Sequence, residues 1–412
     1  MKIVLHHPTG NANVRAAADG LLHADMLAGF STSIATFPGG GLHYLSALSP
    51  LAELNRRRFN PALQTRTHTW PWREAGRLLA TRAGLGRFTA HETGLFCLDS
   101  VYHSLDQHVA ARLGRATPWQ KAAAVYAYED GAAYSFRRAK ELGLRCFYDL
   151  PIGYWRAARR LLASEQERWP AWMPTLGGFL DSAAKLARKD DELRLADRIL
   201  VASRFTADTL RDFPGPLAPI EVIPYGFPVV VEGRTYAGHQ AGRPLKLLFV
   251  GGLSQRKGIA DLFAVADALG PRVELTVVGH KTTADCPALD AALARHRWLP
   301  SLPHAEVLQL MQAHDVLVFP SLFEGFGLVI TEAMSQGTPV ITTNRTAGPD
   351  LIEHGHNGWL IEAGSTAALQ AAIEELLHRP ELLAQAGRAA QETARRRPWA
   401  VYGQELAQAL AH

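Results

Sequence analysis

Residues 315–342 read DVLVFPSLFEGFGLVITEAMSQGTPVIT, and this stretch decides the fold class. It predicts a buried strand over Val316–Pro320, a glycine-containing turn, and a helix over Leu328–Gln336. Gly337 is a suitable helix terminator, and Pro339–Thr342 forms the next strand. The unit is strand–loop–helix–strand. Its loop therefore lies at the carboxyl end of a parallel strand, where open α/β sheets bind ligands.

The rest of the chain repeats this alternation of short apolar runs and helical patterns. Most runs are hydrophobic throughout, as in strands that are covered on both faces. Helices are expected over Ala12–Leu27, Gly258–Leu269 and Thr366–Leu377. The other expected strands are Lys2–Leu5, Ser33–Phe37, Gly94–Leu98, Ala122–Tyr128, Leu144–Leu150, Arg198–Ala202, Ile220–Ile223, Leu245–Val250, Val273–Val278 and Trp359–Ile361. The pattern predicts an α/β protein with doubly wound parallel sheets.

A division near the middle separates two such series of strands and helices. Residues 229–244 carry Gly233, Gly238, Gly242 and Pro244 without clear periodicity, and a new strand opens after them. We therefore expect one α/β domain over residues 1–228 and a second that starts at residue 229.

Composition excludes several classes of protein. Of the 412 residues, 47% are hydrophobic and 20% charged, which is ordinary globular usage. The net charge of +4 is too small to make nucleic acid the default partner. Cys97, Cys146 and Cys286 have no metal-type spacing, and their odd number favours a reduced, cytosolic protein. The sequence has neither a bilayer-spanning apolar stretch nor an N-terminal signal peptide.

The turn after Pro320 has the chemistry of a ligand-binding loop. Gly325 and Gly327 let the backbone approach a ligand closely, and the following helix N-terminus suits phosphate. Glu324 in the turn and Glu332 in the helix are suited to sugar hydroxyls, because carboxylates accept paired hydrogen bonds. The alternative is an ordinary capping loop with a surface glutamate.

A second turn of the same kind follows the strand that ends at Val250. Gly251 and Gly252 lead to two adjacent cations, Arg256 and Lys257, before a helix begins. Such a pair can neutralise a diphosphate leaving group. The alternative is a surface turn with solvated cations, but two such turns in one domain favour a phosphate site.

These motifs, in this order, resemble a known family. They are Phe249-Val250-Gly251-Gly252-Leu253, Lys257-Gly258, Pro320-Ser321, Glu324-Gly325-Phe326-Gly327, Glu332-Ala333, Gly337-Thr338-Pro339-Val340-Ile341, Gly348 and Gly358. The chain is similar to the retaining nucleotide-sugar glycosyltransferases of glycosyltransferase family 4. The resemblance implies the GT-B fold, in which two Rossmann-like domains face each other across a cleft. It also implies that residues 229–396 bind the nucleotide sugar and that residues 397–412 form a helix returning to the N-terminal domain.

The resemblance implies roles for individual residues. Glu324 would hold hydroxyls of the donor sugar, while Lys257 and Arg256 would contact the diphosphate, and these three are the expected catalytic residues. Glu332 would bind the ribose. The expected donor-binding residues are Gly10, Gly325, Phe326, Gly327, Leu328 and Glu332.

The sequence departs from the family pattern at two places. Gly252 stands where the family commonly has arginine, and Arg256 is the candidate replacement. The family often has a histidine after a central strand of the N-terminal domain, but here Glu129 and Asp130 follow that strand. Either residue would contact the acceptor or sugar, or else the segment is a capped helix start.

The expected reaction moves a sugar from a UDP-, GDP- or ADP-linked donor to an acceptor hydroxyl with retention of configuration. The acceptor would be a glycan, a lipid-linked molecule or a small molecule. The sequence has no Asp-x-Asp motif to hold a metal–diphosphate clamp, so no metal and no other cofactor is expected. The alternatives are a nucleotide-sugar epimerase or phosphorylase of the same fold and a non-catalytic sugar-nucleotide-binding subunit.

Two charged segments have a second interpretation. Arginines and tryptophans between Arg56 and Arg87 suit an anionic membrane surface or a lipid-diphosphate acceptor, the alternative being a basic surface with tryptophans packed inward. Residues 184–197 are expected to form a solvated, charge-paired helix. His6-His7 follows the first strand, where it would face the cleft or else have a structural role at the strand end. Neither this pair nor His91-Glu92 completes a metal motif. The expected location is cytoplasmic, with peripheral contact at the inner membrane face.

Overall fold

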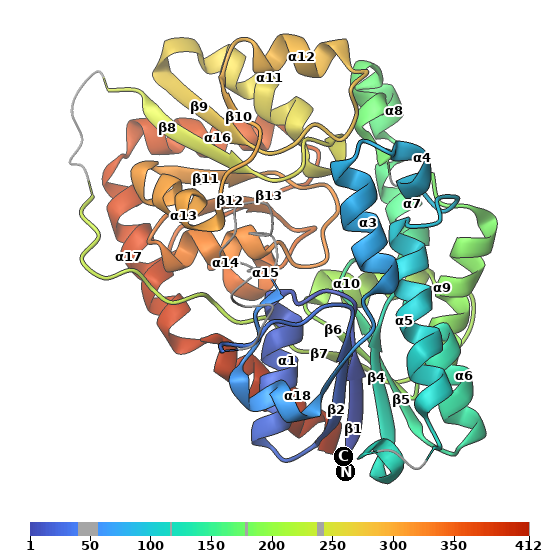
Figure 1. Cartoon of the computed structure of the whole chain (residues 1–412). Helices are drawn as coiled ribbons and strands as arrows, with labels where there is room; N and C mark the ends of the chain where they lie inside the picture. Colours follow the sequence, from blue (N-terminus) through green and yellow to red (C-terminus); the bar gives the residue numbers. More distant parts are fainter. Residues whose placement is uncertain (40–56, 116–117, 178–179, 237–242, 412) are drawn as a thin grey trace.

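The computed structural model describes residues 1–39, 57–115, 118–177, 180–236 and 243–411. These residues form two separate parallel sheets, one in each half of the chain (Figure 1). The N-terminal sheet has the strand order β3-β2-β1-β4-β5-β6-β7, and the C-terminal sheet has the order β10-β9-β8-β11-β12-β13. The predicted α/β class with two doubly wound sheets is confirmed.

The N-terminal sheet and its helices come from the first half of the chain. The strands are β1 Ile3–His6, β2 Leu27–Thr32, β3 Thr67–Thr69, β4 Ala124–Tyr128, β5 Arg145–Leu150, β6 Arg198–Val201 and β7 Ile220–Val222. The helices are α1 Ala12–His23, α3 Trp72–Arg82, α4 Gly86–Thr89, α5 Leu98–Arg112, α6 Ala133–Glu141, α7 Trp155–Leu162, α8 Glu165–Arg168, α9 Ala183–Leu195 and α10 Arg204–Thr209.

The C-terminal sheet repeats this arrangement. Its strands are β8 Leu245–Val250, β9 Val273–Val278, β10 Arg297–Leu299, β11 Val316–Phe319, β12 Val340–Thr343 and β13 Gly358–Ile361. Its helices are α11 Ile259–Leu269, α12 Pro287–Leu293, α13 His304–Ala313, α14 Leu328–Ser335, α15 Gly348–Leu351, α16 Thr366–His378 and α17 Glu381–Arg396.

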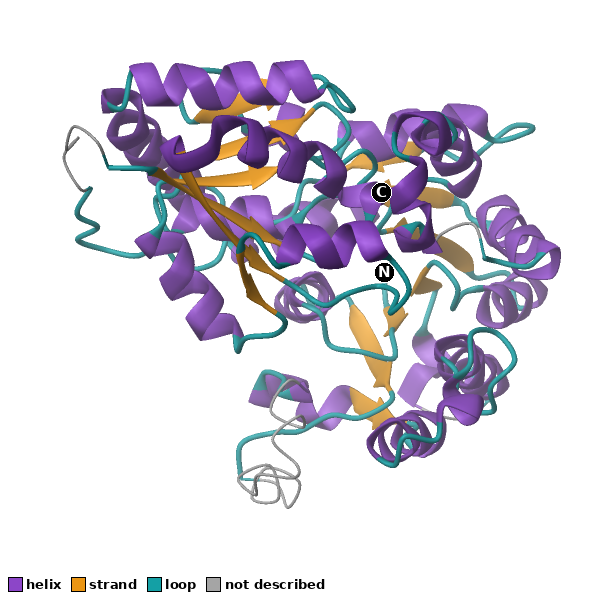
Figure 2. Ribbon diagram, turned by 90° about the horizontal axis from the view of Figure 1, so that it is seen from above, coloured by secondary structure: helices purple, strands orange, loops and turns teal. Residues whose placement is uncertain are grey.

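Helices cover both faces of the sheets (Figure 2). The central strands β4 and β11 are therefore buried at every position, although their residues point alternately to opposite faces. Because both faces of these strands are covered, their sequences are apolar at successive positions rather than alternating between apolar and polar residues. At about 25 cal/mol per Å² of buried apolar surface, these strands contribute much of the hydrophobic stabilisation of each half.

Two predicted strands are wrong, and three strands were missed, namely β2 and the edge strands β3 and β10. The first helix ends at His23 rather than at Leu27. Ser33–Phe37 follows β2 rather than forming a strand, and Gly94–Leu98 is a turn region leading into α5. The segment LAGFST of β2 is less apolar than its successor, yet Gly29 makes room there for the indole of Trp119. The short strands β3 and β10 are half-exposed, so neither has a hydrophobic pattern.

The chain passes between the two halves at two adjacent places. Phe227 donates its backbone N–H to the Arg397 carbonyl, and the Arg397 guanidinium bonds the Pro224 carbonyl. After this crossing, α18 (Trp399–Ala411) packs on α1, where Gly20 and Gly403 allow the two backbones to touch. Both termini consequently lie on the N-terminal domain (Figure 1). The exact residue boundaries of the domains remain predictions.

Candidate functional site between the two sheets

Two adjoining cavities lie between the sheets. One has a volume of about 530 Å³ and is lined by residues that follow β1, β4, β8 and β11. The other, of about 900 Å³, is lined by the start of α1, the start of α13 and Glu332. Asn11 and Val250 line both cavities, so the two adjoin at these residues. We call them the inner cavity and the outer cavity.

The inner cavity contains the three predicted catalytic residues. The Lys257 ammonium contacts the Glu324 carboxylate directly, and Arg256 Nη1 lies 3.4 Å from the same Glu324 oxygen. Arg256 Nη1 also donates to the Phe323 carbonyl at 2.7 Å, and burial lowers the pKa of Arg256 to about 10. Lys257 Nζ lies 4.8 Å from the centre of the Phe319 ring. The two turns recognised in the sequence therefore form one cluster of two cations and a carboxylate.

The two turns are joined by their backbones. Leu322 donates its N–H to the Arg256 carbonyl at 2.8 Å. Gly258 has φ +69° and lies so close to Pro320 that a Cβ would be 2.1 Å from the Pro320 carbonyl oxygen. Only glycine fits this approach, because both the conformation and the contact exclude a side chain. The spacing of Arg256 and Lys257 from Glu324 thus depends on Gly258.

The N-terminus of α14 faces the inner cavity. Gly327 has φ +87° as the N-cap residue, and no side chain of the described residues caps this helix. Phe326, Gly327 and Leu328 line the cavity as predicted. Gly325 instead packs on the N-terminal domain, where a Cβ would lie 1.9 Å from the Pro151 carbonyl oxygen. The free backbone N–H groups of the helix can therefore bind an anion in the cavity.

The Glu324 turn is also held from the N-terminal domain. The buried hydroxyls of Ser203 and Thr206 both donate to the Gly325 carbonyl, at 2.5 and 2.9 Å. Ser203 is the N-cap of α10, so the start of this helix is rigid. The position of Glu324 consequently depends on contact between the two halves of the molecule.

The outer cavity contains Glu332 and Gly10. Glu332 Oε1 lies 3.0 Å from His304 Nε2, and this contact raises the pKa of His304. Gly10 lies at the start of α1, where the Phe59 ring occupies the space that a Cβ would need. Glu332 thus presents one carboxylate oxygen to a large open cavity opposite the first loop of the N-terminal domain.

Several polar residues of the inner cavity were not on the predicted list of site residues. They include His7, Asn13, Tyr102 and Tyr128. His7 Nδ1 lies 2.6 Å from the Thr9 carbonyl and its Nε2 lies 3.3 Å from the Tyr102 hydroxyl. Burial lowers the pKa of His7 to about 4, so the ring is neutral near pH 7. The position of His7 directly after β1 had already indicated that it could face the cleft, and it lines the inner cavity. Tyr102 comes from α5 and has no such signal in the sequence.

Glu129 and Asp130 do not line either cavity. Lys189 Nζ lies 3.2 Å from Glu129 and 3.5 Å from Asp130, and Arg188 also contacts Asp130. Burial raises the pKa of Glu129 to about 7, against the opposing effect of Lys189. The two carboxylates therefore face α9 in this structure, which favours the structural alternative over a contact with substrate.

The prediction that residues 184–197 form a solvated helix is wrong. Lys185, Lys189, Asp190 and Glu192 of α9 are all buried. Glu192 accepts hydrogen bonds from the backbone N–H groups of Asp130, Ala132 and Ala133. The buried charges of α9 each have partners inside the domain: Glu192 caps the start of α6, the two lysines contact carboxylates, and Asp190 bonds the Tyr154 segment. The sequence pattern does not reveal these partners.

Position 252 has room for a side chain. A Cβ on Gly252 would meet only the Thr282 methyl group, at 3.8 Å, within the described structure. Gly252 and Arg256 line the same cavity. The replacement of the family's arginine by Arg256 thus stays a prediction.

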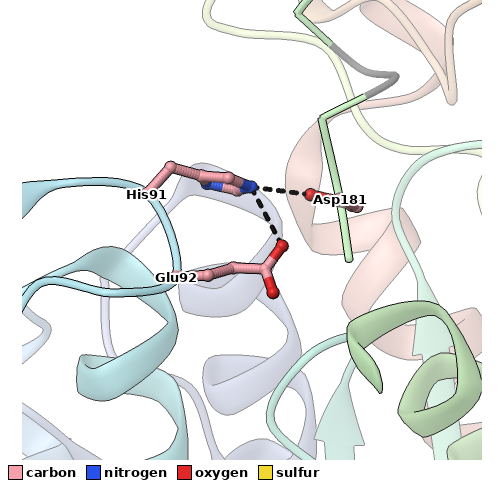
Figure 3. A group of neighbouring side chains, drawn as sticks. All are labelled: His91, Glu92 and Asp181. Atoms are coloured by element: carbon pink, nitrogen blue, oxygen red, sulfur yellow. Dashed lines mark hydrogen bonds and ion pairs between the residues drawn. The ribbon is translucent and has the colours of Figure 1, made fainter. Parts of the chain in front are cut away.

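One group of potential metal ligands lies outside these cavities, among His91, Glu92 and Asp181 (Figure 3). His91 Nε2 lies 3.0 Å from Asp181 Oδ1 and 3.2 Å from Glu92 Oε1. Lys185 Nζ is 3.1 Å from the same Asp181 oxygen, and Glu92 bonds Ser182. An ammonium already neutralises this group, which we call the His91 clip because it ties the loop before α5 to the start of α9.

Two parallel α/β domains that face each other across a cleft define the GT-B class of glycosyltransferase folds. Sucrose-phosphate synthase from Thermosynechococcus elongatus has this fold, with a TM-score of 0.67, 19% identity, and coverage of 100% of this chain and 98% of that chain. Anabaena HepE in complex with UDP-glucose has a TM-score of 0.60 at 18% identity, with coverage of 100% and 99%. The predicted GT-B fold is confirmed.

Residues 237–393 match the family model described as glycosyl transferases group 1. This segment is therefore a domain of that family, as the motifs predicted. Glycogen synthase of Mycobacterium tuberculosis is 30% identical over 260 residues, which is 61% of this chain and 60% of that protein. D-inositol 3-phosphate glycosyltransferase of Arthrobacter sp. is 28% identical over 231 residues, 49% of this chain and 53% of that protein. The chain thus spans about three fifths or less of these curated relatives.

Proposed function

We propose that the protein is a retaining glycosyltransferase that moves a sugar from a nucleotide-diphosphate sugar to an acceptor hydroxyl. One observation carries the proposal. Arg256, Lys257, Glu324 and the free N-terminus of α14 meet in a single cavity, which adjoins the cavity of Glu332. A donor of this kind has a ribose, a diphosphate and a sugar in the same linear order.

The donor would lie across both cavities. Its nucleoside would occupy the outer cavity, with the ribose hydroxyls on Glu332. Its diphosphate would meet the Gly251–Gly252 backbone, Arg256, Lys257 and the N–H groups of α14, while Glu324 would hold the sugar hydroxyls. The cations and the helix N-terminus would stabilise the charge that develops as the sugar–phosphate bond breaks.

The acceptor would approach from the N-terminal side of the inner cavity, where His7, Tyr102 and Tyr128 lie. On the family analogy, an oxygen of the leaving diphosphate takes the proton of the acceptor hydroxyl while the acceptor oxygen bonds to the anomeric carbon. The new bond then forms on the face from which the diphosphate leaves, so the configuration is retained. This arrangement needs no protein base, and neutral His7 with Tyr102 would orient the hydroxyl.

UDP is the first nucleotide to test, because HepE is described in complex with UDP-glucose; GDP- and ADP-sugars are the other predicted donors. A glycan or a lipid-linked acceptor remains a prediction. So does metal independence, which rests on Arg256, Lys257 and α14 neutralising the diphosphate. Transfer should therefore survive excess EDTA. Loss of transfer in EDTA with recovery on adding Mg²⁺ or Mn²⁺ would contradict that part of the proposal.

The decisive experiment is incubation with a panel of UDP-, GDP- and ADP-sugars, with and without added hydroxyl acceptors. We expect nucleotide diphosphate release that rises on adding acceptor. An epimerase would convert the donor without acceptor and leave a free sugar product or an isomerised donor. A non-catalytic subunit would bind a nucleotide in a thermal-shift assay and release none, which would overturn the proposal.

A further inference from the structure

Exposed apolar side chains gather on one part of the N-terminal domain. Trp72 is 67% exposed and Leu79 is 68% exposed, both on α3. Leu85, Leu95 and Leu98 follow in the segment through α4 to the first turn of α5, with exposures of 46%, 52% and 56%. Single exposed apolar residues are normal, but a cluster marks an interaction site. We call these five residues the α3–α5 patch.

The orientation of α3 is the reverse of that of an ordinary surface helix. Glu74 is buried on its inner side, where its carboxylate contacts both Arg57 and Arg77. Trp72 and Leu79 are seven positions apart, so they lie on the same face, which points away from Glu74. The helix therefore presents its apolar face outward and uses an ion pair to attach itself to the domain.

The patch is also positively charged. Arg73, Arg82 and Arg87 lie in the same segment, and none of them is ion-paired with a carboxylate among the described residues. The nearby acids are already occupied, because Glu92 bonds Ser182 and Asp99 contacts Lys185 and Arg188. Arginines beside projecting Trp and Leu side chains match a surface of phosphate groups over acyl chains.

The patch is held rigidly and lies near the cleft. The His91 clip ties the loop between Leu85 and Leu95 to the start of α9 (Figure 3). Leu98 begins α5, and Tyr102, one turn later in the same helix, lines the inner cavity. Figure 1 shows α3 and α4 at the level of the boundary between the two domains.

We propose that the α3–α5 patch binds the surface of a membrane rich in anionic phospholipids. Trp72 and Leu79 enter the boundary between headgroups and acyl chains, and Arg82 and Arg87 contact lipid phosphates. Of the arginines and tryptophans that the sequence predicted for a membrane-binding surface, only some belong to this patch. Trp72 projects outward, whereas Trp70 stacks on His108 and is half-buried. Arg57 is buried, and Arg56 lies outside the described residues. The described residues contain no helix long and apolar enough to cross a membrane.

The proposal is tested by co-sedimentation of the full chain with vesicles of phosphatidylcholine alone or mixed with phosphatidylglycerol. We expect binding to the mixed vesicles only. Replacing Trp72 and Leu79 together by serine should weaken it at least about tenfold, since each large apolar side chain contributes about that factor when buried. The matched control replaces Ile220 and Val229, which are 39% and 91% exposed away from the patch, and should bind like the wild type.

A second pair of variants tests the charge. Arg82→Glu with Arg87→Glu should weaken binding by about fivefold or more for each arginine, while Arg211→Glu with Arg396→Glu should have little effect. All variants should unfold at the wild-type temperature, since the patch side chains are exposed. Wild-type protein that ignores the mixed vesicles would overturn the proposal, as would patch variants that bind them unchanged. A dimer that only the Trp72/Leu79 variant dissociates, without vesicle binding, would instead assign the patch to a second copy of the chain. None of these readouts needs glycosyl transfer.

Discussion

The loop after β4 and the loop after β11 occupy equivalent places in the two sheets, yet they present opposite surfaces. Each follows a fully buried central strand, contains glutamate, and leads to a helix. After β11, Glu324 and two cations face an open cavity, and the N-terminus of α14 has no side-chain cap among the described residues. After β4, Glu129 faces Lys189 inside the domain.

The difference lies in what satisfies the helix N-terminus. Asp106 accepts hydrogen bonds from the N–H groups of Tyr134 and Ser135, and Glu192 accepts those of Ala132 and Ala133. Both carboxylates are buried, so α6 has no free donors to offer a ligand. Equivalent topology thus produces a candidate anion site in one domain and a self-contained polar core in the other.

The largest effect is expected from removing the two cations that contact Glu324 in the loop after β11. Arg256→Ala and Lys257→Ala should each lower turnover by about 10²–10³-fold, because each would stabilise charge on the leaving diphosphate. The double variant should lose nearly all transfer, measured as nucleotide release in the presence of acceptor. Glu324→Gln combined with Lys257→Met is the control for folding, because it removes the Lys257 ammonium together with the carboxylate that it contacts, while Arg256 keeps its hydrogen bond to the Phe323 carbonyl. It should unfold like the wild type and remain inactive. Unchanged turnover in the double variant would move the diphosphate site elsewhere.

Substitutions that affect the loop after β4 should change the stability of the protein rather than its activity. Glu192→Ala leaves several buried N–H groups at the start of α6 without an acceptor, which should lower the free energy of unfolding by about 2–4 kcal/mol. Glu192→Gln retains an acceptor and should cost less. Chemical denaturation measures both, with the exposed Glu167→Ala as a matched control expected to change stability by less than about 0.5 kcal/mol. Equal stability of the Glu192→Ala and Glu167→Ala variants would contradict the comparison.

Glu332→Ala should weaken nucleotide binding while leaving stability nearly unchanged, since Glu332 faces the outer cavity. Loss of a charge-assisted hydrogen bond to the ribose costs roughly 1.5–3 kcal/mol, equivalent to about 10- to 150-fold in Kd. Isothermal titration with nucleoside diphosphates measures this directly. His304→Ala serves as a control, because it removes the partner of Glu332 without removing the carboxylate. If the Glu332→Ala variant bound nucleotide as tightly as the wild type, the ribose assignment would be wrong.

A pH dependence of stability is expected from the buried carboxyl of Asp149. Burial raises its pKa to about 7, against the hydrogen bond that Tyr126 donates to it at 2.5 Å. The folded protein thus keeps this proton where the unfolded chain has lost it. The contribution to stability is largest near pH 4 and declines as the pH rises toward about 7. Asp149→Asn lacks this dependence, so its Tm should rise relative to the wild type as the pH rises from about 4 to about 7, and the difference should stay nearly constant above that range. If the Tm of the wild type and that of the Asp149→Asn variant changed in parallel with pH, Asp149 would have the same pKa in the folded and unfolded states.

The loop after β11 was predictable from sequence because the residues that determine its conformation lie close together in the chain. Gly327, Leu328 to Ser335 and Gly337 specify a turn, a helix and its end within one short stretch, and Glu324 and Glu332 stand at fixed places in it. The buried polar core of the N-terminal domain was not predictable in the same way. Glu192 and Ala132 are far apart in the chain. The sequence of a charged helix has the same pattern whether its charged side chains face water or cap another helix in the interior.

The sequence by itself determined the alternation of strands and helices, the parallel sheets, and the two turns that carry Glu324, Arg256 and Lys257. These follow from hydrophobic period, glycine conformation and helix signals, which act over a few residues. The tertiary structure alone decided that Ser203 and Thr206 hold Gly325, that Tyr102 reaches the inner cavity, and that α3 turns Trp72 outward. The reason is physical: such contacts depend on the packing of elements far apart in the chain, and burial rather than residue type decides whether a charge binds a ligand or a neighbouring backbone.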